Sequence, residues 1–472
     1  MSDVKLEDIV SLAKRRGFIY PGSDVYGGLA GTWDYGPLGV ALKRNIMNLW
    51  WKMFVDEADN MYGVDAAILM NQKVWQASGH VDTFTDPLVE CSNCHNRFRA
   101  DKLDNPDKCP VCGKEHTFGE PRAFNMMFKT YIGPVDETKV AGGATMISDL
   151  NTQTGKADSR ITETNETVKY SLSDDTSLVY LRPETAQGIF TNFKNVVDSF
   201  YPDLPFGLAQ QGKAFRNEIS PRDFIFRSRE FEQMEIEYFV HPDQWETVFE
   251  DWIKRVHLWC DALGLPAESV HELEVPEADR AHYSKRTVDF EFDFPIGREE
   301  LLGLAYRTDF DLMNIQRASG KSMEYRPKDG SKPFVPHVIE PSFGVERALM
   351  AVLSAAYKED EQNGEKRIYL ALPAHLAPVK VAVLPLVKNK PELVAKAREV
   401  YDMLKKEIGN VMWVDTGNIG KNYRKMDEIG TPYCVTVDFE TLEGDTAGTV
   451  TVRNRDTTEQ TRVKIEDLIE SI

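Results

Sequence analysis

The sequence contains no long apolar segment and few cysteines. None of its 472 residues lies in an uninterrupted apolar run of about 18 residues, so no membrane-spanning helix is predicted. The first residues, Met1–Lys5, lack a secretory pattern, and we therefore expect a cytoplasmic protein with no membrane partner. Six cysteines in a chain of this length argue against a disulfide framework.

Acidic residues outnumber basic ones. Lys and Arg number 56 against 75 Asp and Glu, which leaves a net charge of −19. This balance excludes a generally basic surface of the kind that favours nucleic acid. The excess of acidic side chains is unevenly distributed along the chain. Residues 378–472 hold 14 basic and 16 acidic side chains, whereas residues 1–377 hold 42 basic and 59 acidic ones. A nucleic-acid partner would therefore have to bind local basic patches.

The common glycine-rich nucleotide motifs are absent. The stretch Tyr26–Gly39 is rich in glycine and tyrosine, but it lacks both the Lys-Ser/Thr ending of a P-loop and the GxGxxG spacing of a dinucleotide fingerprint. Pro37 is typical of a helix start and predicts a long amphipathic helix from about Val40 to Val55.

Two arginine-bearing stretches are present instead, and the first predicts a hairpin. Phe215–Glu218 and Phe226–Glu237 have strand character and flank a polar turn. This arrangement places Arg216, Arg227 and Phe231 within reach of one ligand. An Arg fork binds two phosphate oxygens at once, and an aromatic face accepts a purine.

The second stretch, Glu340–Arg347, runs directly into the apolar residues Ala348–Leu353. Gly344 just before a helix and Arg347 in its first turn are typical of a helix N-terminus that faces an anionic ligand. Together the two stretches predict the two halves of one ATP site. Taken singly, each could equally be a surface element with solvated arginines.

The two stretches resemble motif 2 and motif 3 of the class-II aminoacyl-tRNA synthetases. Leu181–Gly188 and Arg229–Glu235 narrow the resemblance to the glycyl-tRNA synthetases of the single-chain, homodimeric type. Tyr26–Gly39 and the helix after it resemble motif 1, which builds the dimer interface in that family, although an ordinary packed helix is the alternative.

The resemblance implies an enzyme of translation with a two-step reaction. Glycine and ATP would give glycyl-adenylate and pyrophosphate, and the glycyl group would then move to the terminal ribose of tRNA(Gly). Mg²⁺ would accompany ATP, and the chain would act as a homodimer. The implied catalytic residues are Arg216, Arg347 and Glu184.

The implied ATP site draws on both motifs and on a strand near residue 300. Arg216 would bind the α-phosphate, Glu218 the adenine amino group, and Glu300 the magnesium. The full set is Arg216, Asn217, Glu218, Phe226, Arg227, Ser228, Arg229, Glu230, Phe231, Glu300, Leu301, Gly344, Val345, Glu346 and Arg347.

The implied glycine site contains three glutamates for the ammonium group, a serine at the α-carbon, and two arginines for the carboxylate. For each glutamate the alternative is a solvated or salt-bridged strand residue. The set is Arg99, Glu184, Phe231, Glu232, Gln233, Met234, Glu235, Arg307, Glu340, Pro341, Ser342, Phe343 and Gly344.

Four of the six cysteines form two CxxC pairs, Cys91 with Cys94 and Cys109 with Cys112, with fourteen residues between the pairs. This spacing is typical of a structural Cys₄ zinc ribbon. Four free thiols in a loop are the alternative. His95 and His116 are possible substitute ligands that the site does not require.

We expect an α+β catalytic domain over residues 1–370, built on an antiparallel sheet with flanking helices. An insertion over 88–176 would contain the ribbon, 91–112, and a polar flexible segment, 136–177. After a linker at 371–377, strand–helix alternation over 378–472 predicts a mostly parallel α/β domain that ends in a helix at 465–470. That domain resembles the anticodon-binding domain of glycyl, histidyl, prolyl and threonyl synthetases; a generic α/β accessory domain is the alternative.

Two other functions stay open on the sequence alone. One is an ATP-dependent ligase of the same fold that loads a carrier protein or free amine. The other is a catalytically silent relative that binds RNA or a regulatory partner. The anticodon-type domain disfavours the first, and the intact Arg216, Glu218, Phe231 and Arg347 disfavour the second.

Overall fold

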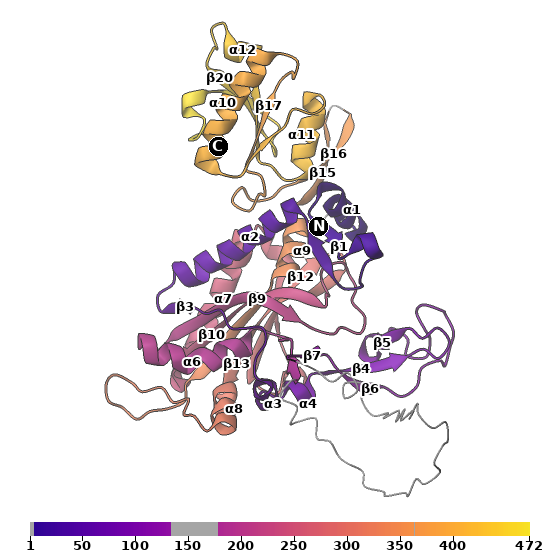
Figure 1. The fold of residues 1–472 in the computed structure, drawn as a ribbon, viewed down its shortest axis with the longest axis vertical. Helices are drawn as coiled ribbons and strands as arrows, with labels where there is room; N and C mark the ends of the chain where they lie inside the picture. Colours follow the sequence, from indigo (N-terminus) through magenta and orange to yellow (C-terminus); the bar gives the residue numbers. More distant parts are fainter. Residues whose placement is uncertain (1–3, 134–177, 363) are drawn as a thin grey trace, which may run out of the picture.

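The computed structural model describes residues 4–133, 178–362 and 364–472, and the predicted polar segment at 136–177 lies outside these residues. The larger part of the chain is built on a seven-stranded sheet, and the C-terminal part forms a separate α/β body beyond it (Figure 1). Among the described helices, none combines the length and the apolar composition that crossing a membrane demands.

The large sheet has the order β11-β12-β13-β14-β10-β9-β3, and every pair is antiparallel except β3 with β9. The predicted antiparallel sheet is thus confirmed. The strands are β3 (Met61–Gly63), β9 (Phe206–Phe215), β10 (Glu230–Val240), β11 (Val270–Glu274), β12 (Arg286–Phe294), β13 (Gly297–Thr308) and β14 (His337–Gly344). The expected hairpin is β9–β10, with Glu230 opposite Phe215.

Alternation along β10 separates the two faces of this sheet. Met234, Ile236 and Tyr238 pack into the core beneath the helices of one face, whereas Glu235 and Glu237 point to the other. Period-two alternation is unavoidable in a strand, so the sequence Phe231–Val240 puts one apolar row in the core and one acidic row opposite. Glu235 of this row belongs to the candidate site.

Helices cover both faces. On the apolar side lie α1 (Leu6–Arg16), α2 (Pro37–Trp51), α7 (Trp245–Ala262) and α9 (Val345–Ala356), and on the other side α6 (Ala186–Phe200) and α8 (Phe310–Ser319). The predicted motif-1 helix is α2, which starts at Pro37 and continues as a π-helix over Lys52–Asp56. α6 runs to Phe200, and its apolar stripe, which contacts β9 and β10, continues to Val197.

The insertion forms a small sheet beside the body that contains the seven-stranded sheet (Figure 1). Its strands, in the order β5-β4-β6, are β4 (Thr85–Glu90), β5 (Arg97–Arg99) and β6 (Arg122–Asn125). Two short helices, α3 (Gln72–Ala77) and α4 (His80–Thr83), precede it, and β7 (Lys129–Tyr131) pairs with β8 (Leu178–Tyr180) after it.

The C-terminal sheet has the order β18-β17-β19-β20-β21 and is only half parallel. Its elements are β17 (Val381–Pro385), α10 (Pro391–Ile408), β18 (Val411–Trp413), α11 (Ile419–Glu428), β19 (Tyr433–Val437), α12 (Phe439–Leu442), β20 (Thr449–Asn454) and β21 (Gln460–Lys464). The prediction of a mostly parallel module was wrong at β20 and β21, which both pair antiparallel. Only five residues join β20 to β21, and so short a connection can only return the chain antiparallel. The helix expected at 465–470 is a single 3₁₀ turn, Ile465–Asp467.

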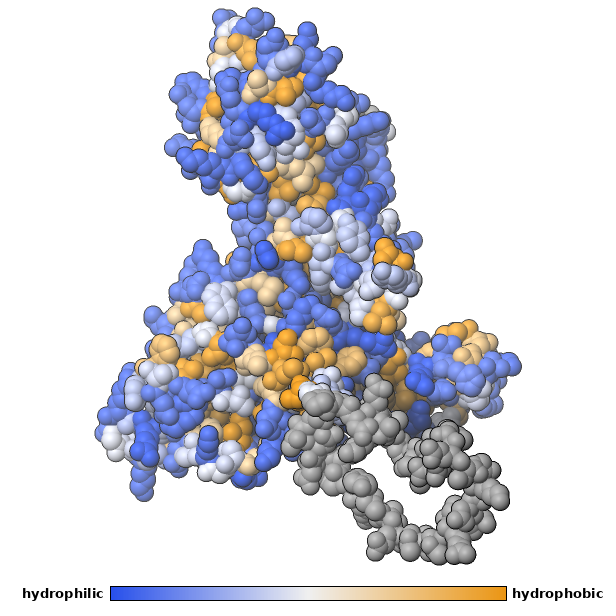
Figure 2. Space-filling model, viewed as in Figure 1, coloured by the Kyte–Doolittle hydropathy of each residue, from blue (hydrophilic) through white to orange (hydrophobic). Residues whose placement is uncertain are grey.

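A hairpin that the sequence analysis did not predict joins the two bodies. It consists of β15 (Tyr357–Gln362) and β16 (Glu365–Leu370), and it carries the fully buried Arg367. Arg367 donates to Asp427 of α11 at 3.3 Å and to the Arg455 carbonyl at 2.7 Å. Asp427 also accepts two bonds from Arg453, at 2.8 and 3.0 Å. The outer surface around this junction is mainly hydrophilic (Figure 2).

Asp427→Ala should loosen this junction. The change removes the carboxylate partner of the buried Arg453 and one of the two carboxylates that Arg367 binds, the other being Asp360. Losing one partner of a buried pair costs about 3 kcal/mol or more. Hydrogen exchange at the amides of β19 and β20 measures the local free energy of opening. Asp402→Ala, at an exposed position on α10, is the matched control. Protection equal to wild type in Asp427→Ala would show that the cluster does not stabilise the junction.

Candidate active site

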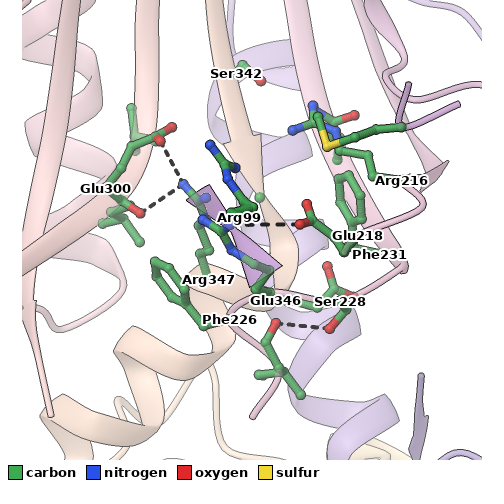
Figure 3. Close-up of a pocket in the computed structure, with 17 residues that line it drawn as sticks. Arg99, Arg216, Glu218, Phe226, Ser228, Phe231, Glu300, Ser342, Glu346 and Arg347 are labelled. Carbon is green, nitrogen blue, oxygen red and sulfur yellow. Dashed lines mark hydrogen bonds and ion pairs between the residues drawn. The ribbon is translucent and has the colours of Figure 1, made fainter. Parts of the chain in front are cut away.

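A cavity of about 220 Å³ opens where β10, β13 and β14 meet the hairpin turn. The predicted ATP residues that line it are Arg216, Glu218, Phe226, Arg227, Ser228, Phe231, Glu300, Leu301, Gly344, Glu346 and Arg347. Figure 3 shows the charged side chains converging on this space from several strands. The two predicted motifs therefore form one site, although the first ends at Glu237 and the second begins only at Glu340.

One nitrogen of the Arg216 guanidinium donates a hydrogen bond to the protein, and the other two face the cavity as possible donors to a ligand. Its Nε donates to the Pro183 carbonyl at 3.1 Å, and its guanidinium lies between the rings of Phe84 and Phe231 at 5.4 and 5.3 Å. Within the part of the chain that the structure describes, its two terminal nitrogens make no hydrogen bond or ion pair. The anchored Arg216 can therefore offer two donors to an anion.

Glu218 presents an unused acceptor. Its side chain is 8 % exposed, and its buried Oε2 has no hydrogen-bond partner among the described residues. Its nearest cation, Arg227, stands 3.8 Å away. A buried acceptor without a donor is costly unless a ligand supplies one. An amino group entering the cavity would satisfy Glu218.

Arg347 lies across the mouth of the cavity from Arg216. It binds Glu300 through both the carboxylate and the carbonyl, at 3.0 Å each, and its guanidinium stands 4.7 Å from the ring of Phe226. The positive charge of Arg347 lowers the pKa of Glu300. Asp289, which the sequence analysis missed, faces Glu300 from β12, and burial together with Glu300 raises its pKa to about 7. These two carboxyls repel each other, and a divalent cation would relieve that repulsion.

Residues from the N-terminal part of the chain contact the start of α9 and hold it in place. Gly344 is the N-cap of α9, and the buried Glu346 accepts a bond from the Tyr35 hydroxyl at 3.0 Å and from the Glu232 amide at 2.8 Å. Lys43 of α2 pairs with the Glu232 carboxylate. Tyr35 and Lys43 were not predicted as site residues, since nothing local in their sequence indicates a partner some 200 to 300 residues away.

Arg99 reaches the cavity from the insertion. It contributes to the cavity wall and is held by Asp86 at 2.9 Å and Asp101 at 2.7 Å. The insertion therefore brings Arg99, a predicted glycine-site residue, to the wall of the first cavity. The two carboxylates fix the direction of the guanidinium, so Arg99 enters the site in a set position.

A second cavity, of about 270 Å³, is lined by the predicted glycine residues. Its wall contains Glu184, Glu235, Glu340 and Ser342, and it shares Arg216, Gln233, Glu300 and Ser342 with the first cavity. An acidic compartment therefore adjoins the arginine-rich one, with Arg216 at the boundary. This arrangement suits a ligand with a cationic end and an anionic end.

Glu184 combines strong pairing with a free oxygen. Burial raises its pKa, but His80 above all, with Arg307 and Arg216, lowers it to about 2, so the carboxylate is ionised. His80 Nε2 lies 3.3 Å from Oε2, whereas the buried Oε1 has no partner among the described residues. His80 is held in turn by Ser78 at 2.8 Å. His80 was not among the predicted site residues.

The position of Glu184 depends on the loop in front of it. Arg182 donates to the carbonyls of Lys213 at 2.6 Å and Ala66 at 2.8 Å, which ties the loop to β9. The Arg182 guanidinium passes so close to Gly212 that a Cβ there would stand 2.2 Å from its nitrogen. Glycine at 212 is therefore required for this close approach.

Glu235 uses its oxygens within the protein. It accepts bonds from the Thr185 amide at 2.9 Å, the Thr185 hydroxyl, Gln233 at 2.9 Å and Ser342 at 2.7 Å. Burial and the neighbouring Glu184 raise its pKa, and the hydroxyl donors of Thr185 and Ser342 oppose that rise. Glu235 therefore orients Ser342 and Gln233 and adds negative charge to the acidic cavity.

Arg307 lies behind the acidic cavity and is only 2 % exposed. It donates to Asp311 of α8 at 2.8 and 2.9 Å and to both oxygens of Glu340 at 2.8 and 2.9 Å, and its guanidinium stands 3.7 Å from the Tyr283 ring. All three of its nitrogens are engaged. The geometry thus makes Arg307 the residue that holds Glu340 in place.

Several predicted residues do not line either cavity. Strand alternation turns Glu232 and Met234 to the opposite face from Glu235, and it likewise turns Pro341 and Phe343 away from Ser342. Val345 is in the core, Arg229 binds the carbonyls of Glu218 and Ala30, and Glu230 pairs with Lys213. The backbone N–H of Asn217 donates to the Met126 carbonyl. These residues support the site from behind.

The four predicted cysteines converge at the tip of the insertion. Their Sγ atoms all lie within 4.8 Å of one another, with Cys91 3.7 Å from Cys112 and Cys94 3.6 Å from Cys109. Tetrahedral zinc with Zn–S bonds of about 2.3 Å requires S–S separations of about 3.8 Å. The cluster therefore fits a Cys₄ metal site, and neither His95 nor His116 belongs to it.

Comparison with known protein families agrees with this architecture. The model of the tRNA synthetase class II core domain (G, H, P, S and T) matches residues 169–356, and that of the anticodon binding domain matches residues 380–472. A solved structure, Giardia lamblia prolyl-tRNA synthetase in complex with prolyl-adenylate, superposes with a TM-score of 0.64. The superposition covers 98 % of this chain and 74 % of the prolyl-tRNA synthetase chain at 15 % identity, so it shows that the two folds are similar.

Curated relatives extend the match over almost the whole length. Glycine–tRNA ligases from Clostridium kluyveri and Thermobifida fusca are each 44 % identical to this chain, and the one from Borrelia garinii is 45 % identical. Each alignment covers 98 % of this chain and 96 % of the relative. The chain therefore belongs to the glycine–tRNA ligase family of class-II aminoacyl-tRNA synthetases.

Proposed function

We propose that the chain attaches glycine to tRNA(Gly) through glycyl-adenylate, as a cytoplasmic homodimer. One observation carries the assignment of the site: two buried glutamate oxygens without donors, on Glu218 and Glu184, lie in adjoining cavities with Arg216 between them. Adenine supplies an amino donor to the first, and glycine supplies an ammonium donor to the second. The reacting carboxylate and α-phosphate then meet at Arg216.

The first step needs no nucleophilic side chain, because the carboxylate of glycine itself attacks the α-phosphorus. Catalysis comes from holding the two groups together and from neutralising the charge that develops. Arg216 binds the α-phosphate, Arg227 and Arg347 bind the β- and γ-phosphates, and Phe231 stacks on adenine. Glu300, with Asp289 beside it, would hold Mg²⁺, which neutralises phosphate charge when bound.

Glycine is recognised by its ends, since it has no side chain. We assign the ammonium group to Glu184 and Glu340, with Glu235 acting through Ser342 and through its charge. Arg99, which Asp86 and Asp101 hold at the cavity wall, is assigned to the carboxylate side, and Arg307 serves by fixing Glu340. Ser342, held by Glu235, stands where a larger amino acid would place its side chain, so exclusion provides the selectivity.

The C-terminal module and the N-terminal helices complete the assignment. The module over 380–472 would bind the anticodon region through splayed bases and stacking, which does not require a strongly basic domain. α2 and the π-helix after it would form the dimer contact. The cysteine cluster would hold one structural zinc ion and thereby keep Arg99 directed into the site.

A pyrophosphate-exchange assay with each of the twenty amino acids tests this function. Glycine alone should support exchange in the absence of tRNA, and tRNA(Gly) should then be charged. Exchange without charging would indicate a ligase that loads another acceptor. No exchange with any amino acid would indicate a catalytically silent relative, and either result would contradict the proposal.

Arg216→Ala should reduce adenylate formation by about two orders of magnitude or more, the size expected when a transition state loses a charged partner. The KM for glycine should change little, because Arg216 binds phosphate. Arg222→Ala, in the exposed turn of the same hairpin, is the matched control and should keep normal exchange without tRNA. Activity within a few-fold of wild type in Arg216→Ala would refute the α-phosphate assignment.

Metal analysis of the purified chain should find about one zinc ion per chain. Replacing Cys109 and Cys112 with Ser should release the metal and weaken exchange, because the strand that carries Arg99 loses its support. His95→Ala with His116→Ala is the control and should retain zinc, since both imidazoles lie outside the cluster. Zinc-free protein from a preparation without chelator would rule out the metal site.

A further inference from the structure

Glu237 is a carboxyl to which the proposed reaction gives no role. It lies on β10 two residues beyond Glu235 and on the same face, and it is 0 % exposed. Neither of its side-chain oxygens has a hydrogen-bond partner among the described residues. An ionised carboxylate without donors is very unfavourable inside a protein, whereas the protonated acid is tolerated.

The charged groups that face Glu237 come from several elements and are mostly acidic. Glu340 on β14, Glu235 on β10 and Asp311 on α8 are carboxyls, and Arg307 on β13 is the cation. The strand and helix that complete the surroundings bring no charge. Leu208 lies opposite Glu237 on β9, and the buried residues of α6 are apolar or uncharged.

Arg307 cannot neutralise Glu237. Its Nε and one terminal nitrogen donate to Asp311, and the other terminal nitrogen donates to Glu340, at 2.8 to 2.9 Å throughout. Two carboxylates thus share one guanidinium, and a third would be uncompensated. In agreement with this geometry, burial and then the Glu340 carboxylate raise the pKa of Glu237 well above its ordinary value.

We propose that Glu237 holds a proton while the acidic cavity is empty and releases it when the ammonium group of glycine enters beside Glu340. The inference rests on the proposed function, because it takes glycine as the ligand. Glu340 is both the strongest charged neighbour of Glu237 and part of the cavity wall, so it connects the buried acid to the entering cation.

The exchange balances in charge. The O–H bond of Glu237 breaks, its electron pair stays on the oxygen, and the proton leaves to solvent as one ammonium group arrives. One positive charge replaces another beside the same carboxyls. Glu237 thereby acts as a positioning residue, which keeps the empty cavity from carrying an uncompensated charge and adds attraction once the cation is present.

The coupling has a definite sign. Binding that releases a proton strengthens as the pH rises, so the KM for glycine should fall with pH, by at most about tenfold per pH unit for one proton. Glutamine imitates the protonated acid and cannot ionise. Glu237→Gln should therefore match wild type near pH 6 and show no such fall, which leaves its KM about tenfold higher near pH 8.5.

The test is the KM for glycine in the exchange assay between about pH 6 and about pH 8.5, where glycine stays a zwitterion. Glu268→Gln, at an exposed position, is the control and should follow wild type. The KM for ATP, measured in the same experiments, corrects for the titration of groups that contact the phosphates of ATP. A wild-type KM that does not vary with pH, or a Glu237→Gln variant that keeps the wild-type slope, would overturn the coupling.

A KM raised equally at every pH by Glu237→Gln would also overturn it, because Glu237 would then be ionised throughout. If that variant does not fold, the change in pH is measured when wild-type protein is mixed with glycine in weakly buffered solution. Release of up to one proton per site supports the coupling, and the absence of proton release refutes it. Loss of glycine-dependent exchange at every pH would refute the proposed function as well, whereas a flat profile refutes the coupling alone.

Discussion

The catalytic site depends on one guanidinium group buried behind it. Arg307 binds Asp311 and Glu340 with all of its nitrogens, and this permits the sheet to keep a group of carboxyls away from water. Without that cation, several negative charges in one compartment would destabilise the fold. With it, the compartment remains acidic enough to attract an ammonium group. Structure and specificity thus rest on the same ion cluster.

Strand alternation turns this cluster into a site with two compartments. One face of β10 and β14 packs against α2, α7 and α9, and the other brings Glu235, Glu340 and Ser342 to the acidic cavity. The hairpin and the start of α9 then add arginines at the neighbouring cavity (Figure 3). Anionic and cationic compartments meet at Arg216, where a carboxylate and a phosphate would react. The insertion and the N-terminal residues hold this boundary from outside.

The sequence predicts the parts of the site that short-range patterns encode. The β9–β10 hairpin, the glycine before α9 and the convergence of four cysteines were predicted from spacing and turn chemistry, and the structure contains all three. Some residues that were predicted as parts of continuous site segments line neither cavity. Strand alternation turns Met234 and Phe343 into the core. His80 and Tyr35 act through partners distant in sequence, and no local pattern indicates such contacts. For the same reason the junction at Arg367 was not predicted.

The most direct test of this account is a crystal structure of the chain with glycine and a non-hydrolysable ATP analogue. The glycine ammonium group should lie within hydrogen-bond distance of Glu184 and Glu340, the adenine amino group should meet Glu218, and Arg216 should contact the α-phosphate. Glycine bound with its carboxylate toward the glutamates, or an adenine ring away from Phe231 and Glu218, would contradict it.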